Sequence, residues 1–143
     1  MNDTTAFDKE YRAAKQYTWH LIAIKNYSTQ QIRKKLMSRE ISSETIDAVI
    51  RDCQKIGYLD DRQWAESFAR NEIRKNNGPN LIIAKLRNKG IPDDIASDVI
   101  GKSYPPNLQQ AIITKLLKTK YRAADKPAIL RALFRRGFNE INI

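Results

Sequence analysis

The chain has 143 residues and a formal net charge of +10, with 29% charged and 41% hydrophobic residues. This composition is typical of a folded, helix-rich protein rather than a disordered one, and no apolar run approaches the roughly 20 residues that cross a bilayer. The single cysteine excludes an internal disulfide framework and the start MNDTTAFDKE has no apolar signal-peptide core, so we expect a cytoplasmic protein with no membrane association.

The positive charge is concentrated near the C-terminal end. Residues 101–143 hold nine lysines and arginines against two acidic residues. A field of this sign attracts polyanions, of which nucleic acid is the obvious candidate. Solubility alone is achieved with a much smaller net charge. The composition therefore favours a polyanionic partner.

Three helices are predicted in the first part of the chain, over residues 8–26, 28–39 and 42–57. Ser28 and Ser42 are the N-cap candidates, because each precedes a run with helical apolar spacing. The last of these helices should end at a glycine in the left-handed conformation. The residues expected to be buried are Tyr11, Ala14, Tyr17, Leu21, Ile24, Ile32, Leu36, Ile46, Val49, Ile50 and either Cys53 or Ile56.

The same succession of helices then begins again. Asp60 is the N-cap candidate of a helix that the segment NNGPN should end. Pro79 should begin the next helix, and Pro92 should begin a third. A further cycle starts with an apolar stripe from Leu108 to Leu117 and continues with a helix that should bury Ile129, Leu130, Leu133 and Phe134. The final helix would begin at Asn139, close to the last residue.

One phrase occurs three times, as LMSREISSE from Leu36, LRNKGIPDD from Leu86 and LFRRGFNEI from Leu133. Each copy has a leucine, a basic residue, a turn, an apolar residue and a polar helix start, and no segment alternates as a strand does. We therefore predict an all-α protein of three tandem three-helix repeats, each helix-turn-helix-like, that form an elongated curved array with the last repeat truncated. The predicted repeats cover residues 1–57, 58–103 and 104–143.

The ordered set of motifs resembles the RecX family of bacterial recombination regulators. Its most specific parts are GYLDDRQWA from Gly57 and GPNLIIAKLRNKGI from Gly78. The resemblance implies three tandem three-helix repeats and a protein that binds the RecA nucleoprotein filament, contacts DNA and inhibits strand exchange, ATPase and coprotease activities. It implies no catalytic residue. The residues that match the family motifs are expected to have structural roles. They are Gly57, Tyr58, Leu59, Asp60, Asp61, Gly78, Pro79, Leu86 and Gly90. Glu40 departs from the family motifs, because a turn glycine is expected there.

Basic residues crowd the second helix of each predicted repeat, and they are the candidates for contact with DNA or the filament. A solvated charged face is the alternative explanation. The candidates are Arg33, Lys34, Lys35 and Arg39 in the first repeat, Lys85, Arg87 and Lys89 in the second and Arg131, Arg135 and Arg136 in the third, with Arg70, Arg74 and Lys75 as an extension.

Other chemistry-bearing residues have simpler explanations. Asp60 and Asp61 point about 100° apart on a helix, so capping explains them better than a metal site. His20 has no partner at ligand spacing, and Cys53 lies on an apolar stripe. We expect no enzyme activity, no cofactor and no metal. Trp64 should pack in a core, whereas Trp19 and Tyr104 are left open as possible stacking platforms for bases.

Three functions remain compatible with the sequence. The first is a monomeric RecX-like regulator of RecA filaments that contacts single- and double-stranded DNA through phosphates. The second is a stand-alone helix-turn-helix-like DNA-binding protein, although the third helices SSETIDAVIRD and PDDIASDVI are acidic. The third is a structural scaffold, which the charge makes least favoured.

Overall fold

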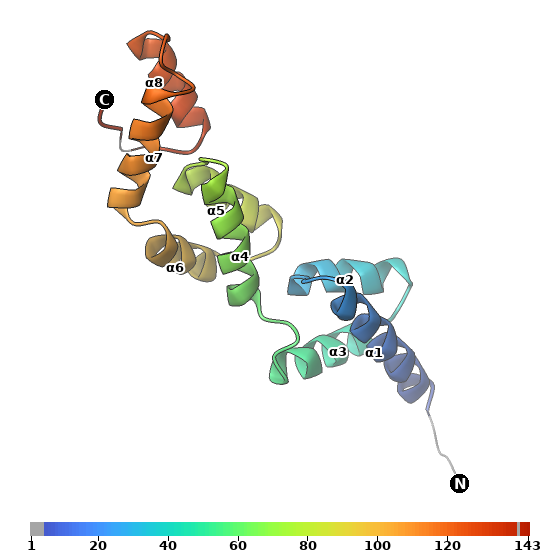
Figure 1. Cartoon of the computed structure of the whole chain (residues 1–143). Coiled ribbons are helices and arrows are strands. Elements are labelled where there is room, and N and C mark those ends of the chain that lie inside the picture. The colour runs from blue at the N-terminus through green and yellow to red at the C-terminus, as the bar shows by residue number, and fades with distance from the viewer. Residues whose placement is uncertain (1–4, 140) are drawn as a thin grey trace. The chain divides into compact units, whose positions relative to one another are not determined.

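A computed structural model describes residues 5–139 and 141–143, and every regular element in that part of the chain is a helix (Figure 1). The all-α prediction is confirmed. Contacts divide the chain into two units, residues 1–64 and 65–143, each considered by itself below. The helices are α1 (Ala6–Ile24), α2 (Thr29–Ser38), α3 (Ser43–Lys55), α4 (Asp61–Arg74), α5 (Pro79–Asn88), α6 (Asp93–Ser103), α7 (Pro106–Lys118) and α8 (Lys126–Arg135).

Helix starts in the first unit are set by short polar side chains. Ser28 is the N-cap of α2, as predicted, and forms a capping box with Gln31: the Ser28 hydroxyl accepts from the Gln31 amide at 3.3 Å, and the Ser28 amide donates to the Gln31 side chain at 3.0 Å. Ser42 caps α3 in the predicted way, accepting from the Thr45 amide at 3.4 Å. These contacts satisfy amides that have no partner inside the helix.

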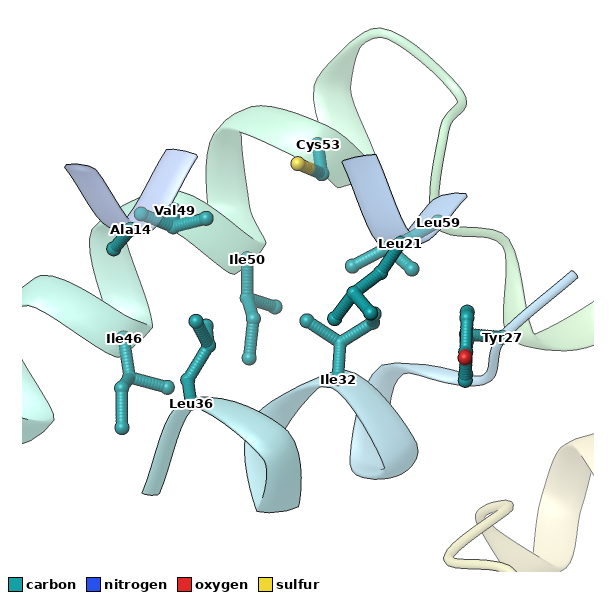
Figure 2. Packing of buried hydrophobic residues seen from close by; sticks show 10 residues of the cluster. All are labelled: Ala14, Leu21, Tyr27, Ile32, Leu36, Ile46, Val49, Ile50, Cys53 and Leu59. Atoms are coloured by element: carbon teal, nitrogen blue, oxygen red, sulfur yellow. The ribbon is translucent and has the colours of Figure 1, made fainter. Parts of the chain in front are cut away.

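The core of the first unit lies among α1, α2 and α3 (Figure 2). Its buried side chains include most of those predicted, namely Ala14, Leu21, Ile32, Leu36, Ile46, Val49, Ile50 and Cys53. Tyr27 and Leu59, which were not predicted, complete the cluster. Glu10 links α1 to the start of α3 by hydrogen bonds. Its carboxylate accepts hydrogen bonds from the Ser42 hydroxyl, the Thr45 hydroxyl and the Ser42 amide. These hydrogen bonds lower the pKa of Glu10.

One predicted core position in the first unit is wrong, since Ile24 is 68% exposed. Of the two alternatives at the end of α3, Cys53 is buried and Ile56 is 56% exposed. Ile24 is the last residue of α1 and Ile56 is the C-cap of α3, so both lie where the chain leaves the helix. Spacing along a helix indicates a face, but it does not indicate whether a neighbouring helix covers the end of that face.

The repeated phrase forms the same turn three times. Glu40, Gly90 and Gly137 follow α2, α5 and α8 with φ values of +60°, +82° and +98°. The next residue then donates its amide back to the carbonyl of the phrase's leucine. These bonds join Ile41 to Leu36 at 3.4 Å, Ile91 to Leu86 at 3.0 Å and Phe138 to Leu133 at 3.1 Å. This left-handed ending satisfies helix carbonyls and sends an apolar side chain back toward the core. Glu40 thus adopts the glycine conformation that its side chain disfavours.

In the second unit, the end of α8 packs closely against the start of α5. The Gly78 amide donates to the Arg136 carbonyl, and the Asn80 amide donates to the Gly137 carbonyl at 3.0 Å. A Cβ atom on Gly78 would come within 2.5 Å of the Gly137 backbone, and one on Gly137 within 2.4 Å of the Leu81 nitrogen. Both glycines are therefore needed for the close approach of the two backbones.

After α8 the chain continues without helix through the described residues 138, 139 and 141–143. Phe138 nevertheless occupies the core, with its ring edge-on to Tyr104 at 6.3 Å between centroids. The Tyr104 hydroxyl donates to the Asn77 carbonyl at 2.8 Å, and burial raises the pKa of that hydroxyl. The expectation that Leu130 and Phe134 are buried is wrong, since they are 38% and 70% exposed. The elongated, curved arrangement of the array stays a prediction.

Replacing Glu40 by glycine should stabilise the chain. Glycine adopts φ near +60° without the steric cost that a side chain carries, so we expect the free energy of unfolding to rise by about 0.5–1 kcal/mol. Glu44→Gly is the matched control, because it removes the same charge from a helical position in α3 and should lower stability by about 1 kcal/mol. Urea denaturation followed by circular dichroism measures both. Equal losses in the two variants would contradict the assigned turn.

Candidate nucleic-acid interface

Most of the predicted contact residues lie on or just after α2, α5 and α8, the second helices of the repeats. Arg39, Lys89 and Arg136 occupy the same place in the three copies of the phrase, the C-cap immediately before the left-handed residue. A cation is favourable at this end of a helix, because the unpaired carbonyls there carry partial negative charge. The basic residue of the phrase therefore has a structural explanation as well as a functional one.

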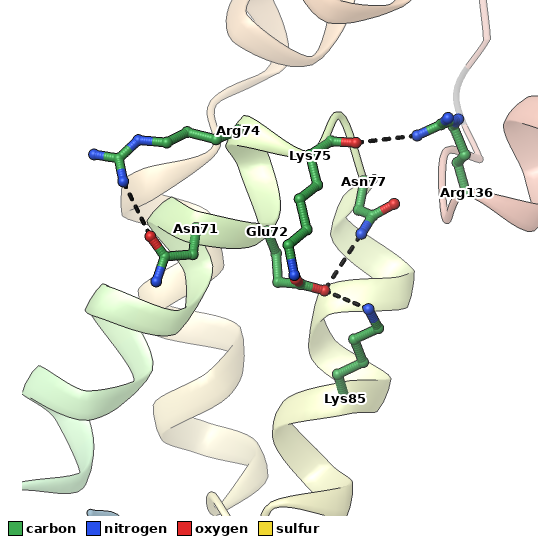
Figure 3. A network of polar contacts seen from close by, with 7 residues as sticks. All are labelled: Asn71, Glu72, Arg74, Lys75, Asn77, Lys85 and Arg136. Atoms are coloured by element: carbon green, nitrogen blue, oxygen red, sulfur yellow. Dashed lines mark hydrogen bonds and ion pairs between the residues drawn. The ribbon is translucent and has the colours of Figure 1, made fainter. Parts of the chain in front are cut away.

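Arg136 uses its charge inside the second unit. Its Nη1 donates to the Lys75 carbonyl at 3.1 Å (Figure 3) and to the Asn76 carbonyl at 3.2 Å. Its Nε donates to the Tyr121 hydroxyl at 2.8 Å. The guanidinium thus satisfies carbonyls where α4 ends and joins that end to α8. We conclude that Arg136 positions helices, which the sequence interpretation missed.

Lys75 and Lys85 both pair with Glu72 of α4, whose side chain is only 3% exposed (Figure 3). The Glu72 Oε2 atom lies 3.1 Å from Lys75 Nζ, while Oε1 accepts from Lys85 Nζ and from the Asn77 side-chain amide. Burial raises the pKa of Glu72, but the hydrogen bonds from Lys85 and Lys75 outweigh it and the net shift is downward. These two lysines compensate a buried carboxylate, a role that no local pattern in the sequence indicates.

Arg33 and Arg87 form ion pairs with the acidic third helices. Arg33 Nη1 lies 2.8 Å from Asp47 Oδ1, and Arg87 Nε lies 2.9 Å from Asp93 Oδ1. All four side chains are more than a third exposed, so the pairs add little stability in water. Their main effect is to reduce the positive charge at these two positions.

Other candidates make contacts that leave their charge uncompensated. Arg70 and Arg74 donate to the neutral side chains of Ser67 and Asn71, each at 3.0 Å. The Arg39 guanidinium lies 3.6 Å from the centre of the Tyr17 ring, and Lys35 Nζ lies 5.6 Å from that of Tyr27. Four further candidates are exposed and have no carboxylate within ion-pair distance among the described residues, namely Lys34, Lys89, Arg131 and Arg135.

A basic hollow of about 420 Å³ lies in the second unit beside α8. It brings Arg135 and Arg136 together with Lys120, which sequence reasoning missed. Lys120 lies in the basic run KTKYR after α7, and this run was the signal available. The remaining lining residues are Asn77, Leu81, Tyr121 and Ala132. Cations beside neutral polar groups suit a phosphate.

The paired aspartates act at helix starts, as predicted, but in different ways. Asp60 Oδ1 accepts from the Gln63 amide at 3.1 Å and so caps α4. Asp61 Oδ1 accepts from the Thr29 amide at 2.9 Å, which places a carboxylate at the start of α2. Within residues 5–139 and 141–143, no three histidine, cysteine or acidic side chains gather as metal ligands do. No helix found there has the length and apolar character needed to cross a membrane.

The aromatic candidates separate by burial. Trp64 is 9% exposed and Tyr104 is 1% exposed, so both serve the interior. Trp19 is 45% exposed and is the one of the three that a ligand can reach.

Two consecutive three-helix bundles of one pattern, with cations on their second helices and acidic third helices, define a tandem three-helix repeat protein. Comparison with known families agrees. Residues 14–53 match the first three-helix domain of RecX and residues 60–100 match the second. The chain belongs to the RecX family.

Individual relatives give the same result. A regulatory protein RecX of Thermus thermophilus is 31% identical over 122 residues, which cover 85% of this chain and 81% of that protein. The one from Prosthecochloris aestuarii is 35% identical over 94 residues, and the match spans 65% of this chain and 62% of that relative. The crystal structure of RecX from Lactobacillus salivarius shares the fold, with a TM-score of 0.81 and 23% identity over 92% of this chain and 90% of that one.

Neighbouring arginines at the end of α8 should behave differently when replaced. Arg136→Gln removes charged donors from two carbonyls and a hydroxyl, so we expect the free energy of unfolding to fall by about 2–3 kcal/mol. Arg135→Gln serves as the control and should change stability by less than about 0.5 kcal/mol. Urea denaturation of both variants tests this. A stable Arg136→Gln protein would return Arg136 to the contact candidates.

Proposed function

We propose that this chain binds RecA nucleoprotein filaments and inhibits their strand-exchange, ATPase and coprotease activities, and so modulates recombination, DNA repair and the SOS response. Membership of a family of regulatory proteins supports the proposal. The observation that carries it is a group of exposed cations, on or just after the second helices, that have no carboxylate partner among the described residues. Lys34, Lys89, Arg131 and Arg135 are the members of this group that the test below uses. The protein acts by binding, without a cofactor and without a chemical step.

The physical basis is phosphate contact. A lysine or arginine that neutralises a phosphate releases condensed counterions, and this gain is available on single- and double-stranded DNA alike. Contacts of this kind position a protein on a nucleic acid without selecting its sequence. That property suits a regulator that must act wherever a filament forms.

The alternative, a stand-alone helix-turn-helix-like DNA-binding protein, is less well supported. Such proteins read base edges with the N-terminal residues of the recognition helix. In the helices that would take this role, the first turns carry Glu44 in α3 and Asp93 and Asp94 in α6. Carboxylates there repel the phosphates that flank the major groove. Selective binding to one duplex sequence, with no effect on RecA, would favour this alternative.

The test is inhibition of RecA ATP hydrolysis on single-stranded DNA. Wild-type protein should inhibit, whereas a variant with Lys34, Lys89, Arg131 and Arg135 all changed to Gln should inhibit weakly. The salt dependence should also fall, by up to about 0.7 in the logarithmic slope for each lost contact with a single strand.

The control variant changes four other exposed cations to Gln, namely Lys9, Arg51, Lys102 and Lys118, which lie on first and third helices. It has the same net charge as the test variant. Equal inhibition by the two variants would show that net charge, rather than the second helices, mediates binding. Unchanged ATP hydrolysis at saturating wild-type protein would contradict the proposed function itself.

A further inference from the structure

An exposed aromatic hollow lies in the first unit, away from the second helix α2. Its walls are Trp19, Ile22 and Ala23 of α1 and Tyr58, which follows α3, and its volume is about 300 Å³. The two rings are half exposed and meet edge to face, with their centres 6.5 Å apart. Two large aromatic rings exposed side by side around a hollow offer an apolar surface that a ligand can contact.

The Trp19 ring is held in place before any ligand arrives. Its indole lies next to Cys53, which is fully buried in the core of the unit. Lys15, one turn earlier on α1, places its ammonium 5.1 Å from the ring centre. A ring fixed in this way loses little side-chain freedom when it binds, which favours affinity.

The other side of Trp19 is basic. A second hollow, of about 340 Å³, is lined by Arg12, Lys15, Gln16 and Trp19. Trp19 therefore separates an apolar hollow from a cationic one. A ligand that occupies both must carry a flat or apolar group next to an anionic group.

An aromatic and cationic row extends this arrangement along α1. The Phe7 and Tyr11 rings are stacked with their centres 6.0 Å apart. Lys15 Nζ lies 5.4 Å from the centre of the Tyr11 ring, between that ring and the Trp19 ring. Residues four apart share a helix face and advance by about 6 Å along it. The row Phe7, Tyr11, Lys15 and Trp19 thus places one cation between two stacked rings and the Trp19 ring.

We propose that Trp19 and Tyr58 form a stacking site for a base of single-stranded nucleic acid, with Arg12 and Lys15 holding the adjacent phosphate. Each nucleotide supplies the flat group and the anion that the two hollows require. Bases in a duplex are covered by their neighbours, so the site selects single strands. The inference rests on the proposed function, in that it names the part of a nucleoprotein filament that α1 contacts.

The test uses Trp19→Leu, which keeps an apolar side chain but removes the ring, and Trp19→Phe, which keeps a smaller ring. Phe134→Leu is the control, because it removes an exposed ring from α8 in the second unit. Binding is measured by fluorescence anisotropy to a twelve-nucleotide strand of deoxythymidine, to an abasic strand of equal length and to a duplex. Thermal melting by circular dichroism checks that each variant is folded.

Trp19→Leu should weaken deoxythymidine binding by about 5- to 100-fold, since one stacked base contributes about 1–3 kcal/mol. Binding to the abasic strand and the duplex should change by less than about twofold, and Trp19→Phe should recover part of the loss. Wild-type tryptophan fluorescence should be quenched by the deoxythymidine strand.

Equal losses on the deoxythymidine and abasic strands would overturn the stacking site. Unchanged strand binding, together with weaker binding of Trp19→Leu to RecA without DNA, would overturn it and assign the hollow to a protein partner. The proposed function fails separately. If the wild type stacks deoxythymidine through Trp19 yet leaves RecA ATP hydrolysis unchanged, the site stands and the RecA proposal falls.

Discussion

The turn that ends the second helix determines how each repeat is built. A residue in the left-handed conformation follows the end of the helix, and the next amide closes back on the carbonyl of the phrase's leucine. The leucines, Leu36, Leu86 and Leu133, are completely buried. Because one face of each second helix is held against the core in this way, the opposite face is turned outward. The cations Lys34 and Arg131, two residues before the leucine in their repeats, stand on the exposed side.

The phrase repeats in sequence, but its basic residue has a different surrounding in each copy. Arg39 lies on the face of Tyr17, Lys89 has no carboxylate partner in the described chain, and Arg136 joins the ends of α4 and α8. Helix-end electrostatics explains why all three are basic. Repetition of a charge is therefore weak evidence for a shared binding surface. The groups that each cation contacts distinguish a structural cation such as Arg136 from a candidate for contact with DNA or RecA.

Local features were predictable from the sequence, whereas long-range pairing was not. The serine caps and the glycine turns depend on residues a few positions apart, and all of those predicted are found. Burial failed at Ile24 and Phe134, because helical spacing does not show which helix ends are covered. The pairing of Lys85 with Glu72 and of Asp61 with the Thr29 amide joins residues 13 and 32 positions apart. No local pattern in the sequence indicates such contacts. The sequence therefore indicated which cations are candidates, but not which of them have a structural role instead.

In our proposal the second helices contact DNA and RecA, α1 adds a site for single-stranded nucleic acid, and the acidic third helices stay outside the contact. Hydrogen–deuterium exchange with and without RecA filaments on single-stranded DNA tests this assignment most directly. We expect slower exchange in α2, α5 and α8, with α3 and α6 nearly unchanged. Protection confined to α3 and α6 would contradict the assignment and favour a conventional helix-turn-helix protein.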